Sequence, residues 1–336
     1  MRQLTLEGPE RITWLDVPEP ELTDDGQALV RPLAVATCDM DLMISRGESP
    51  FPAPIALGHE GVAEVVEVGK AVRSVKVGDR VVVPFQISCG TCDRCRRGGT
   101  DACERVPPLS MYGFGAAGGG WGGLLSDLVR VPFADAMLVK VPEGLDPTAV
   151  ASASDNIPDG WRLVAPFLAE RPGADVLILG GGTRSIALYG VAIAVALGAG
   201  RVDYVDDDPT RLAVASDLGA NALESDPERG AYGIVGDGSA RADGLRTAIA
   251  ATEPGGHCTH AGVLFENDVP LPMLAMYTIG VHLHVGRVAA RPAIPAILSM
   301  TATGRLDPAK VTDRIVPWDE AGEAIVQDHT KLVFAR

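Results

Sequence analysis

The sequence predicts an α/β protein of two domains, one of which contains a doubly wound parallel sheet of the Rossmann type. Two observations lead to this prediction. At 336 residues the chain is long enough to bury two hydrophobic cores. In its second half, a short apolar run ends in three glycines and opens an apolar helix, and the next apolar run ends in an aspartate. This order of strand, glycine turn, helix and acidic strand end is typical of a dinucleotide-binding unit.

The glycine turn lies in residues 175–199, D-V-L-I-L-G-G-G-T-R-S-I-A-L-Y-G-V-A-I-A-V-A-L-G-A. Gly180 permits a tight turn, and Gly182 allows the backbone to approach a pyrophosphate at the helix N-terminus. Ser185 stands where a third glycine is usual and is small enough for helix–strand packing. Further cofactor-binding candidates in the turn are Thr183 and Arg184, although Arg184 is equally compatible with a solvated side chain.

The next strand, R-V-D-Y-V-D, ends at Asp206, at the distance expected for a carboxylate that bonds ribose hydroxyls. Such a carboxylate repels a 2′-phosphate, and Asp207 and Asp208 add negative charge. The pattern therefore favours NAD over NADP. Arg211 and Gly262, the latter at the end of a later strand, are further cofactor-binding candidates. The alternative is an α/β layer without a nucleotide, in which the glycines only form a turn.

Composition excludes several classes of function. The chain is 46% hydrophobic and 22% charged, which is ordinary for a folded soluble protein. The net charge of −15, without a basic stripe, disfavours nucleic-acid binding. The longest apolar stretch, which begins at Ile186, is too short and too rich in Ala and Gly to span a bilayer. The start, M-R-Q-L-T-L-E-G-P-E, lacks the apolar core of a signal peptide, so a cytoplasmic protein is expected.

Four cysteines are spaced C-x2-C-x2-C-x7-C in residues 89–103, C-G-T-C-D-R-C-R-R-G-G-T-D-A-C. One loop with this spacing can present four sulfurs tetrahedrally to zinc. A four-sulfur shell leaves no open position, so the metal would be structural. A nearby group of arginines can offset the negative charge of the thiolates. The predicted ligands are Cys89, Cys92, Cys95 and Cys103.

Several segments occur in the order found in one enzyme family. They are A-L-G-H-E-G-V-A-E-V-V-E-V-G (56–69), V-K-V-G-D-R-V-V-V-P (75–84), the cysteine loop and the glycine turn. With them, the chain resembles the zinc-dependent alcohol dehydrogenases of the medium-chain dehydrogenase/reductase superfamily. The resemblance implies a GroES-like, partly open β-barrel catalytic domain of residues 1–159 and 292–336. It places a Rossmann domain at residues 160–291.

Three further segments indicate one branch of that superfamily: residues 119–135, residues 154–161 and the Arg46-Gly47 pair. They resemble glutathione-independent formaldehyde dehydrogenases and bacterial secondary alcohol dehydrogenases. That branch uses an aspartate as a ligand to the catalytic zinc, and S-D-N-I-P-D-G-W places Asp155 at this position. Because relatives are dimers or tetramers, the resemblance also implies a homodimer or a homotetramer.

The resemblance assigns a catalytic zinc to Cys38, His59 and Asp155, which leaves a fourth position for a small-molecule alcohol or carbonyl substrate. Asp41 matches a residue that orients the histidine, and Glu60 matches a residue that transiently approaches the metal. Together these assignments predict hydride transfer between NAD(H) and an alcohol, aldehyde or ketone. The alternatives are a core thiol, a surface His-Glu pair and a helix-capping aspartate.

The chain departs from the family at its proton relay. The family places Ser or Thr two residues after the cysteine, and this branch places a histidine three residues later. Here the two positions hold Met40 and Met43, which cannot carry protons. Asp159 and Arg162 also replace the family's usual residues.

Three functions remain compatible with these departures. The first is alcohol–carbonyl conversion in which water, Glu60 or Asp159 handles the proton. The second is reduction of an activated C=N or C=C bond, for which the relay is unnecessary. The third is an inactive nucleotide-binding protein, which the intact zinc ligands disfavour.

The remaining candidates are a lysine and five residues of two later strands. Lys331 stands where relatives place a cation for the cofactor pyrophosphate, and an exposed lysine is the alternative. Strand alternation places Cys258 and His260 on one face and His257 on the other. Packing or solvent exposure is expected for these three residues, and also for His282 and His284.

Overall fold

The computed structural model describes all residues, Met1–Arg336, and the chain divides into two compact units. The first unit consists of Met1–Pro158, Ala289–Gly304 and Thr312–Arg336. The second consists of Asp159–Val288 and Arg305–Val311. Residues 305–311 therefore belong to the second unit, whereas the sequence-based division placed them in the first. None of the helices combines the length and the apolar composition that a membrane-spanning helix requires.

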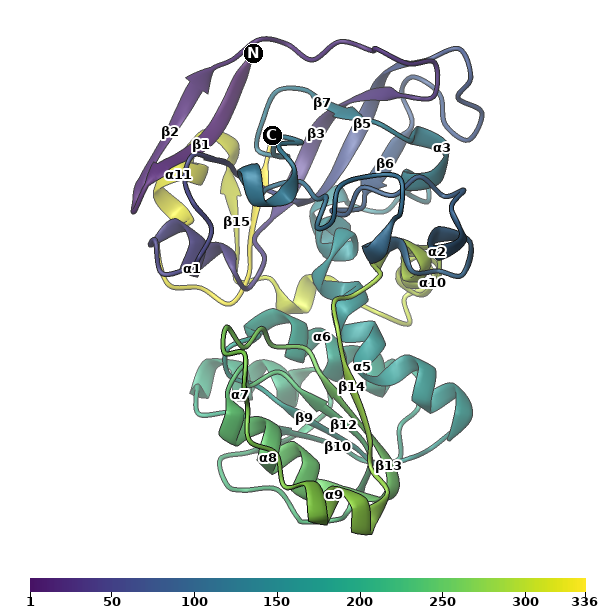
Figure 1. Cartoon of the computed structure of the whole chain (residues 1–336), viewed down its shortest axis with the longest axis vertical. Coiled ribbons are helices and arrows are strands. Elements are labelled where there is room, and N and C mark those ends of the chain that lie inside the picture. Colours follow the sequence, from purple (N-terminus) through teal and green to yellow (C-terminus); the bar gives the residue numbers. More distant parts are fainter. The chain divides into compact units, whose positions relative to one another are not determined.

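The first unit is built on two β-sheets (Figure 1). The smaller sheet has the order β2-β1-β4, with β1 (Arg2–Gly8), β2 (Arg11–Asp16) and β4 (Ile55–Ala56). The larger sheet has the order β15-β16-β3-β5-β6-β8, and β7 also pairs with β3. Its strands are β3 (Ala28–Ala36), β5 (Glu60–Val68), β6 (Arg80–Val83), β7 (Val129–Val131), β8 (Val139–Lys140), β15 (Arg314–Pro317) and β16 (Leu332–Ala335). Both sheets are antiparallel except for the parallel pair β15–β16.

Strand β3 is the centre of the larger sheet because its side chains are almost all buried. It pairs with β16, β5 and β7, so both of its edges are hydrogen-bonded. Its sequence A-L-V-R-P-L-A-V-A is the near-continuous apolar run expected of a strand covered on both faces. Pro32 cannot donate to the ladder, and the register with β5 shifts between Pro32 and Ala34.

Short helices join the strands of the first unit. Asp146 accepts a hydrogen bond from the Thr148 N–H and caps one helix, in which Pro147 occupies the first turn. The α-helices are α1 (Asp41–Ser45), α2 (Asp93–Arg96), α3 (Ala134–Met137), α4 (Pro147–Val150), α10 (Ala290–Ala302) and α11 (Ala321–Ala324). The 3₁₀-helices are η1 (Thr100–Ala102), η2 (Gly115–Gly118), η3 (Ala151–Ser154) and η5 (Trp318–Glu320).

The second unit contains one parallel six-stranded sheet in the order β11-β10-β9-β12-β13-β14. Its strands are β9 (Val176–Leu179), β10 (Val202–Val205), β11 (Asn221–Leu223), β12 (Tyr232–Asp237), β13 (Thr252–His260) and β14 (His282–Val285). The helices are α5 (Asn156–Glu170), α6 (Arg184–Ala196), α7 (Pro209–Asp217), α8 (Ala242–Ala251), α9 (Met273–Ile279) and the 3₁₀-helix η4 (Pro308–Val311). The first three residues of α5 lie in the first unit.

Helices cover the two faces of this sheet. On one face, Leu177, Val235 and Cys258 form a buried cluster with Leu245 and Ile249 of α8. On the other face lie α5 and α6, which approach each other closely where Gly160 meets Gly190. The strand order reverses beside β9, between β10 on one side and β12 on the other. In sheets of this kind, ligands bind beyond the carboxyl ends of the strands at such a reversal.

Candidate metal and cofactor sites

The cysteine loop brings its four sulfur atoms together in the first unit. The ligand atoms of Cys89, Cys92, Cys95 and Cys103 all lie within 4.8 Å of one another, and all four residues are buried. All four cysteines are free thiols. The close spacing works because helix α2 begins directly after Cys92 and turns the chain back towards the other sulfurs. The arrangement has the ligand set and the spacing of a structural zinc site.

Backbone N–H groups surround these sulfurs. Cys89 Sγ accepts from the N–H groups of Cys92 at 3.3 Å and Thr91 at 3.4 Å, and Cys103 Sγ accepts from Cys89 N–H at 3.4 Å. Burial opposes ionisation of Cys89, yet the donors on Thr91 and Cys92 lower its pKa to about 6. The nearby Arg94 and Arg96 pair with Glu104 and Asp93 at the surface. The backbone N–H groups of Glu104 and Cys95 lower the pKa of Cys92 as well, whereas burial raises the pKa of Cys95 to about 12 and also raises that of Cys103. Before metal binds, the loop therefore favours the thiolate, the form that binds zinc, at Cys89 and Cys92 only.

A second cluster joins residues from distant parts of the first unit. Cys38 follows β3, His59 precedes β5, Glu60 begins β5 and Asp155 follows η3. One ligand atom from each lies within 4.8 Å of the others, and all four residues are buried. Gly58 permits this arrangement, because its φ of +86° favours glycine and an added Cβ would lie 2.7 Å from Leu125 N.

The electrostatics of this second cluster suit a bound cation. Burial raises the pKa of Cys38, and the carboxylates of Asp155 and Glu60 raise it further. Burial likewise raises the pKa of Glu60 to about 8, against the opposing effect of Lys331. Burial lowers the pKa of His59, but the Asp41 and Asp155 carboxylates outweigh it and raise the pKa to about 9. A divalent cation would favour the thiolate, the carboxylates and the neutral imidazole together.

Unpaired polar atoms in this cluster also fit a metal. Both imidazole nitrogens of His59 are buried without a hydrogen-bond partner. Nε2 lies 3.4 Å from Asp155 Oδ2, and Nδ1 lies 3.8 Å from Asp41 Oδ1. Asp41 Oδ2 accepts the Cys38 N–H at 2.8 Å, which holds this carboxylate between the cysteine and the histidine. Because buried imidazoles seldom lack partners, His59 has the chemistry of a ligand oriented by Asp41.

The two positions of the expected proton relay lie beside this cluster. Met40 is the N-cap residue of α1 and Met43 lies within that helix, and both side chains are half-buried. A thioether is at most a weak acceptor and has no proton to donate. Met40 and Met43 thus supply packing and no acid–base group, so the acid–base groups near Cys38 in this segment are the carboxylates of Asp39 and Asp41.

Lys331 is fully buried in the first unit, so the alternative of an exposed lysine is wrong. Its ammonium donates to the Thr37 carbonyl and lies 3.3 Å from Glu60 Oε2. A contact of Lys331 with a cofactor phosphate stays a prediction. The structure shows a different contact, an ion pair with a carboxylate of the second cluster.

The glycine turn of the second unit connects β9 to α6. Gly181 has a φ of +120° and is the residue of this turn that requires glycine, although the sequence singled out its two neighbours. An added Cβ on Gly182 would lie 2.6 Å from Ala240 Cβ. The Thr183 hydroxyl donates to the Gly238 carbonyl at 2.8 Å, and Ser185 is fully buried. These glycines therefore let the turn pack against the loop that follows β12.

The acidic residue after β10 already has several partners. Arg211 donates to both oxygens of Asp206, from Nη2 at 2.7 Å and from Nε at 2.8 Å. Tyr204 donates its hydroxyl at 2.5 Å, and the N–H groups of Asp207 and Asp208 donate as well. Burial opposes ionisation, but these donors lower the pKa of Asp206 to about 2. Asp206 is thus a fixed carboxylate, and sequence reasoning missed its Tyr204 partner.

Two polar residues at the carboxyl edge of the same sheet were not combined by sequence reasoning. Asp237 ends β12 and His260 ends β13, and His260 Nδ1 lies 2.7 Å from Asp237 Oδ2. The signal that could have found them is a polar residue at the end of each of two strands. Nearby, Arg162 pairs with Asp159 and donates to the His260 carbonyl at 3.3 Å.

The other histidines behave as strand alternation predicts. Cys258 packs in the core under α8, and His257 stacks on Phe167 of α5 with ring centroids 4.4 Å apart. His257 Nδ1 lies 3.1 Å from His284 Nε2, and the His257 and His282 rings stack at 4.9 Å. Packing therefore accounts for His257 and Cys258, whereas His282 and His284 are exposed.

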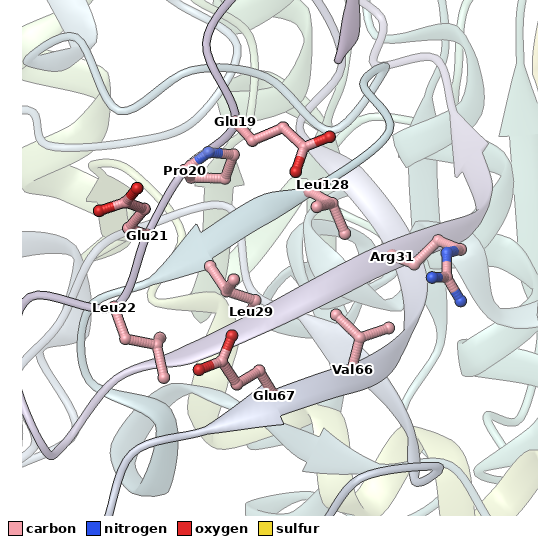
Figure 2. A pocket seen from close by; sticks show the side chains of 9 residues that line it. All are labelled: Glu19, Pro20, Glu21, Leu22, Leu29, Arg31, Val66, Glu67 and Leu128. Carbon is pink, nitrogen blue, oxygen red and sulfur yellow. The ribbon is translucent and has the colours of Figure 1, made fainter.

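A shallow hollow of about 450 Å³ lies on the first unit, away from either sulfur-containing cluster (Figure 2). It lies over β3 and β5 and is lined by Glu19, Pro20, Glu21, Leu22, Leu29, Arg31, Val66, Glu67 and Leu128. None of these residues belongs to a metal-ligand set, and the hollow contains three glutamates against one arginine. It therefore does not mark the reaction site.

Comparisons with known proteins agree with both units. The alcohol dehydrogenase GroES-like domain family matches residues 24–143. A probable zinc-binding alcohol dehydrogenase of Mycobacterium tuberculosis is 30% identical over 336 residues, which cover 96% of this chain and 84% of that protein. A glutathione-independent formaldehyde dehydrogenase of Pseudomonas aeruginosa is 34% identical over 225 residues, which cover 63% of this chain and 55% of that protein.

The structure of an alcohol dehydrogenase from Thermus sp. ATN1 superposes with a TM-score of 0.92 at 29% identity, covering 100% of this chain and 99% of that one. The predicted fold class, a GroES-like domain and a Rossmann-like parallel sheet, is confirmed. The chain belongs to the zinc-type alcohol dehydrogenases of the medium-chain dehydrogenase/reductase family.

Proposed function

We propose that this chain is a zinc-dependent oxidoreductase that transfers hydride between NAD(H) and a small alcohol or the corresponding aldehyde or ketone. The observation that carries the proposal is the buried cluster around His59, whose two ring nitrogens lack hydrogen-bond partners. Family membership supports it, since the relatives at 30% identity or above include a zinc-binding alcohol dehydrogenase and a formaldehyde dehydrogenase.

Cys38, His59 and Asp155 would hold the catalytic zinc. Three protein ligands leave one position open for substrate, and zinc supplies Lewis-acid polarisation of the substrate oxygen. Asp41 holds the imidazole in place, and Glu60 lies close enough to approach the metal. With Asp155 as a ligand, the chain would belong to the branch of glutathione-independent formaldehyde dehydrogenases and bacterial secondary alcohol dehydrogenases. Its support is the burial of Asp155 and its 3.4 Å approach to His59.

The cysteine loop would hold a second, structural zinc, so two zinc ions per chain are expected. Its support is the all-thiolate ligand set, which fills a tetrahedral shell and leaves no position for substrate. The loop therefore contributes to the stability of the first unit and takes no part in the reaction.

The cofactor would bind at the carboxyl edge of the Rossmann-like sheet, and we favour NAD(H) over NADP(H). The support is the charge after β10, where Asp206, Asp207 and Asp208 lie around the single guanidinium of Arg211. The excess negative charge would repel a 2′-phosphate. Further contacts are proposed from Gly180, Gly182, Thr183, Arg184, Ser185, Gly262 and Lys331.

The proton released by alcohol oxidation needs an acceptor other than Met40 and Met43. Asp159 is one candidate, but its carboxylate is paired with Arg162, and protonation would break this ion pair. Water and Glu60 are the other candidates. Asp159→Asn should strongly depress turnover if Asp159 accepts the proton. An unchanged pH–rate profile in this variant would remove Asp159 from the mechanism.

A second candidate function is the reduction of an activated C=N or C=C bond. The observation that favours it is the pair of thioethers at the relay positions, because such a reduction does not need a hydroxyl relay. An inactive nucleotide-binding protein is a third candidate. The retention of a complete, buried ligand set counts against it.

The deciding experiment is metal analysis of the purified protein combined with a panel of alcohols, carbonyls and activated imines and enones, followed by NADH absorbance. Two zinc ions per chain and alcohol turnover support the main proposal. Turnover of only imines or enones supports the second candidate. One zinc ion per chain and no hydride transfer to any carbonyl would refute the main proposal.

We also propose that the chain acts as a homodimer or homotetramer in the cytoplasm, on the basis of the family resemblance alone. Light scattering coupled to gel filtration measures the oligomeric state. A molar mass equal to that of one chain would contradict it.

A further inference from the structure

A buried aspartate–histidine pair in the second unit has an unused nitrogen. Asp237 is 0% exposed and His260 is 4% exposed. Asp237 Oδ2 lies 2.7 Å from His260 Nδ1, and Asp237 Oδ1 accepts the Ser239 N–H at 3.0 Å. The remaining ring nitrogen, Nε2, is buried and has no hydrogen-bond partner. Buried ring nitrogens of this kind are rare in native proteins and call for a ligand or another explanation.

The aspartate determines what His260 can bind. An ionised carboxylate only accepts hydrogen bonds, so Nδ1 carries the proton that it donates to Asp237. In the neutral imidazole, Nε2 then presents a lone pair. The backbone is held as well, because Arg162 Nη2 donates to the His260 carbonyl at 3.3 Å. The pair is therefore an oriented acceptor for an O–H or N–H group of a ligand.

The strand register places this acceptor relative to the glycine turn. Asp237 of β12 is opposite both Leu179 of β9 and His260 of β13, so the three residues form one row across the sheet. Leu179 is followed directly by Gly180. Two strand spacings amount to roughly 10 Å. His260 therefore lies about one nucleoside away from the turn where a pyrophosphate would bind, on the side of the sheet opposite to β10.

Doubly wound sheets bind the two halves of a dinucleotide on the two sides of the strand-order reversal. The Asp206 side, β9–β10, takes the adenosine half by the argument given above. The side with β12 and β13 is left for the other nucleoside. We propose that His260, oriented by Asp237, binds the nicotinamide nucleoside through Nε2, accepting a hydrogen bond from its amide N–H or from a ribose hydroxyl. This inference rests on the proposed NAD(H)-linked function.

The test compares the affinity of the zinc-loaded protein for NADH, followed by NADH fluorescence, with its affinity for ADP, followed by calorimetry. His260→Phe keeps a flat ring but removes the acceptor, and it should weaken NADH binding roughly tenfold. ADP contains no nicotinamide nucleoside, so its affinity should stay unchanged. The matched control is His257→Phe, on the same strand but on the opposite face against Phe167, which should bind NADH as the wild type does.

Two further variants keep the test decisive if His260→Phe does not fold. His260→Gln restores an acceptor oxygen and should recover part of the NADH affinity. Asp237→Asn removes the carboxylate that fixes the tautomer, and it should weaken NADH binding while leaving ADP binding unchanged. The analogue 3-acetylpyridine adenine dinucleotide, in reduced form, separates the two donors. If the amide is the donor, His260→Phe has little effect on its binding, whereas a ribose donor gives the same loss as with NADH.

The outcomes separate this inference from the proposed function. A wild type that binds ADP and NADH has the cofactor site. If His260→Phe and Asp237→Asn then bind NADH as tightly as the wild type, the role of His260 is refuted and the proposed function stands. If the wild type binds neither ligand, the proposed function fails and the inference fails with it. A parallel loss of NADH and ADP affinity would indicate a structural role and also overturns the inference.

Discussion

The two metal-ligand clusters of the first unit differ in how they are assembled. The cysteine loop draws all its ligands from residues 89–103, and backbone N–H groups of the same loop bond to its sulfurs. The cluster around His59 combines residues from three segments, Cys38, His59-Glu60 and Asp155, and mixes a thiol, an imidazole and carboxylates. Its imidazole nitrogens lie near carboxylates but have no hydrogen-bond partner.

This difference fits the roles proposed for the two clusters, one in stability and the other in the reaction. In the loop, hydrogen-bond donors lower the pKa values of Cys89 and Cys92 whereas burial raises those of Cys95 and Cys103, and metal binding would complete a shell whose four sulfur atoms already lie together. In the buried cluster, acidic groups crowd together and the pKa values of Cys38, His59 and Glu60 are all raised. Clusters of groups with strongly shifted pKa values are typical of functional sites. Four tests address the comparison.

The largest expected effect is on stability, from a change in the loop. Cys92→Ala should remove one zinc ion per chain and with it the folding energy of the loop, because structural zinc contributes on the order of 10 kcal/mol in small zinc domains. Elemental analysis and thermal unfolding measure both effects. Cys258→Ala, which removes a core thiol of the second unit, is the control and should keep both zinc ions. A Cys92→Ala protein with unchanged zinc content and unfolding temperature contradicts the structural role.

The second test alters the reactive cluster. His59→Gln should lower kcat/KM roughly 10³-fold, corresponding to about 4 kcal/mol of transition-state stabilisation, while the loop keeps its zinc. Steady-state kinetics on an alcohol substrate and elemental analysis measure this. The comparison between the clusters breaks down if this variant loses both zinc ions or unfolds like the loop variant.

The third test uses pH on metal-free protein. The pKa of His59 is raised from 6.5 to about 9 by Asp41 and Asp155 against the effect of burial. Between these two pH values the folded chain therefore holds one proton more than the unfolded chain. The unfolding free energy that this proton contributes is fully present below pH 6.5 and is lost as the pH rises to 9. Chelator-treated protein should lose on the order of 3 kcal/mol of unfolding free energy across this range. Urea unfolding measures it, and His59→Gln should flatten the curve. An equally steep curve in that variant would assign the effect to other groups.

The smallest expected effect concerns the relay positions. Met40→Ser introduces a hydroxyl two residues after Cys38, and it should raise alcohol oxidation by up to about 10²-fold, the lower range of acid–base assistance. Met43→Ser places a hydroxyl at the other position and serves as the matched control. Initial rates with NAD and an alcohol measure the change. No gain in either variant favours reduction of a C=N or C=C bond.

The sequence was informative where the chemistry is local. The spacing of the cysteines predicted a four-sulfur cluster because one loop contains every ligand. The glycine turn and the strands around it predicted the parallel sheet because the turn, the helix and the strand end are consecutive in the chain. Cys38, His59, Glu60 and Asp155 were brought together by family resemblance, since no spacing rule connects three separate segments.

Contacts that depend on strand order could not be predicted. Asp237 and His260 meet because β12 and β13 are neighbouring strands in this register. The sequence of neither strand indicates that the two strands pair. The pairing of Lys331 with Glu60 joins residues 271 positions apart. Tyr204 bonds to Asp206 because alternate side chains of a strand end point the same way, but a buried tyrosine gives no signal of its partner. Each contact is a property of the assembled sheet.

The buried pair of Glu60 and Lys331 has a consequence for biosynthesis. The lysine is translated 271 residues after the glutamate. At 5–20 residues per second, the ribosome needs on the order of tens of seconds to supply it. Once Asp155 has been translated, the nascent first unit contains its thiol, imidazole and carboxylates but still lacks the cation that pairs with Glu60. Zinc that arrives in this interval meets an excess of negative charge, so the order in which metal and lysine reach the cluster becomes a feature of how the enzyme matures.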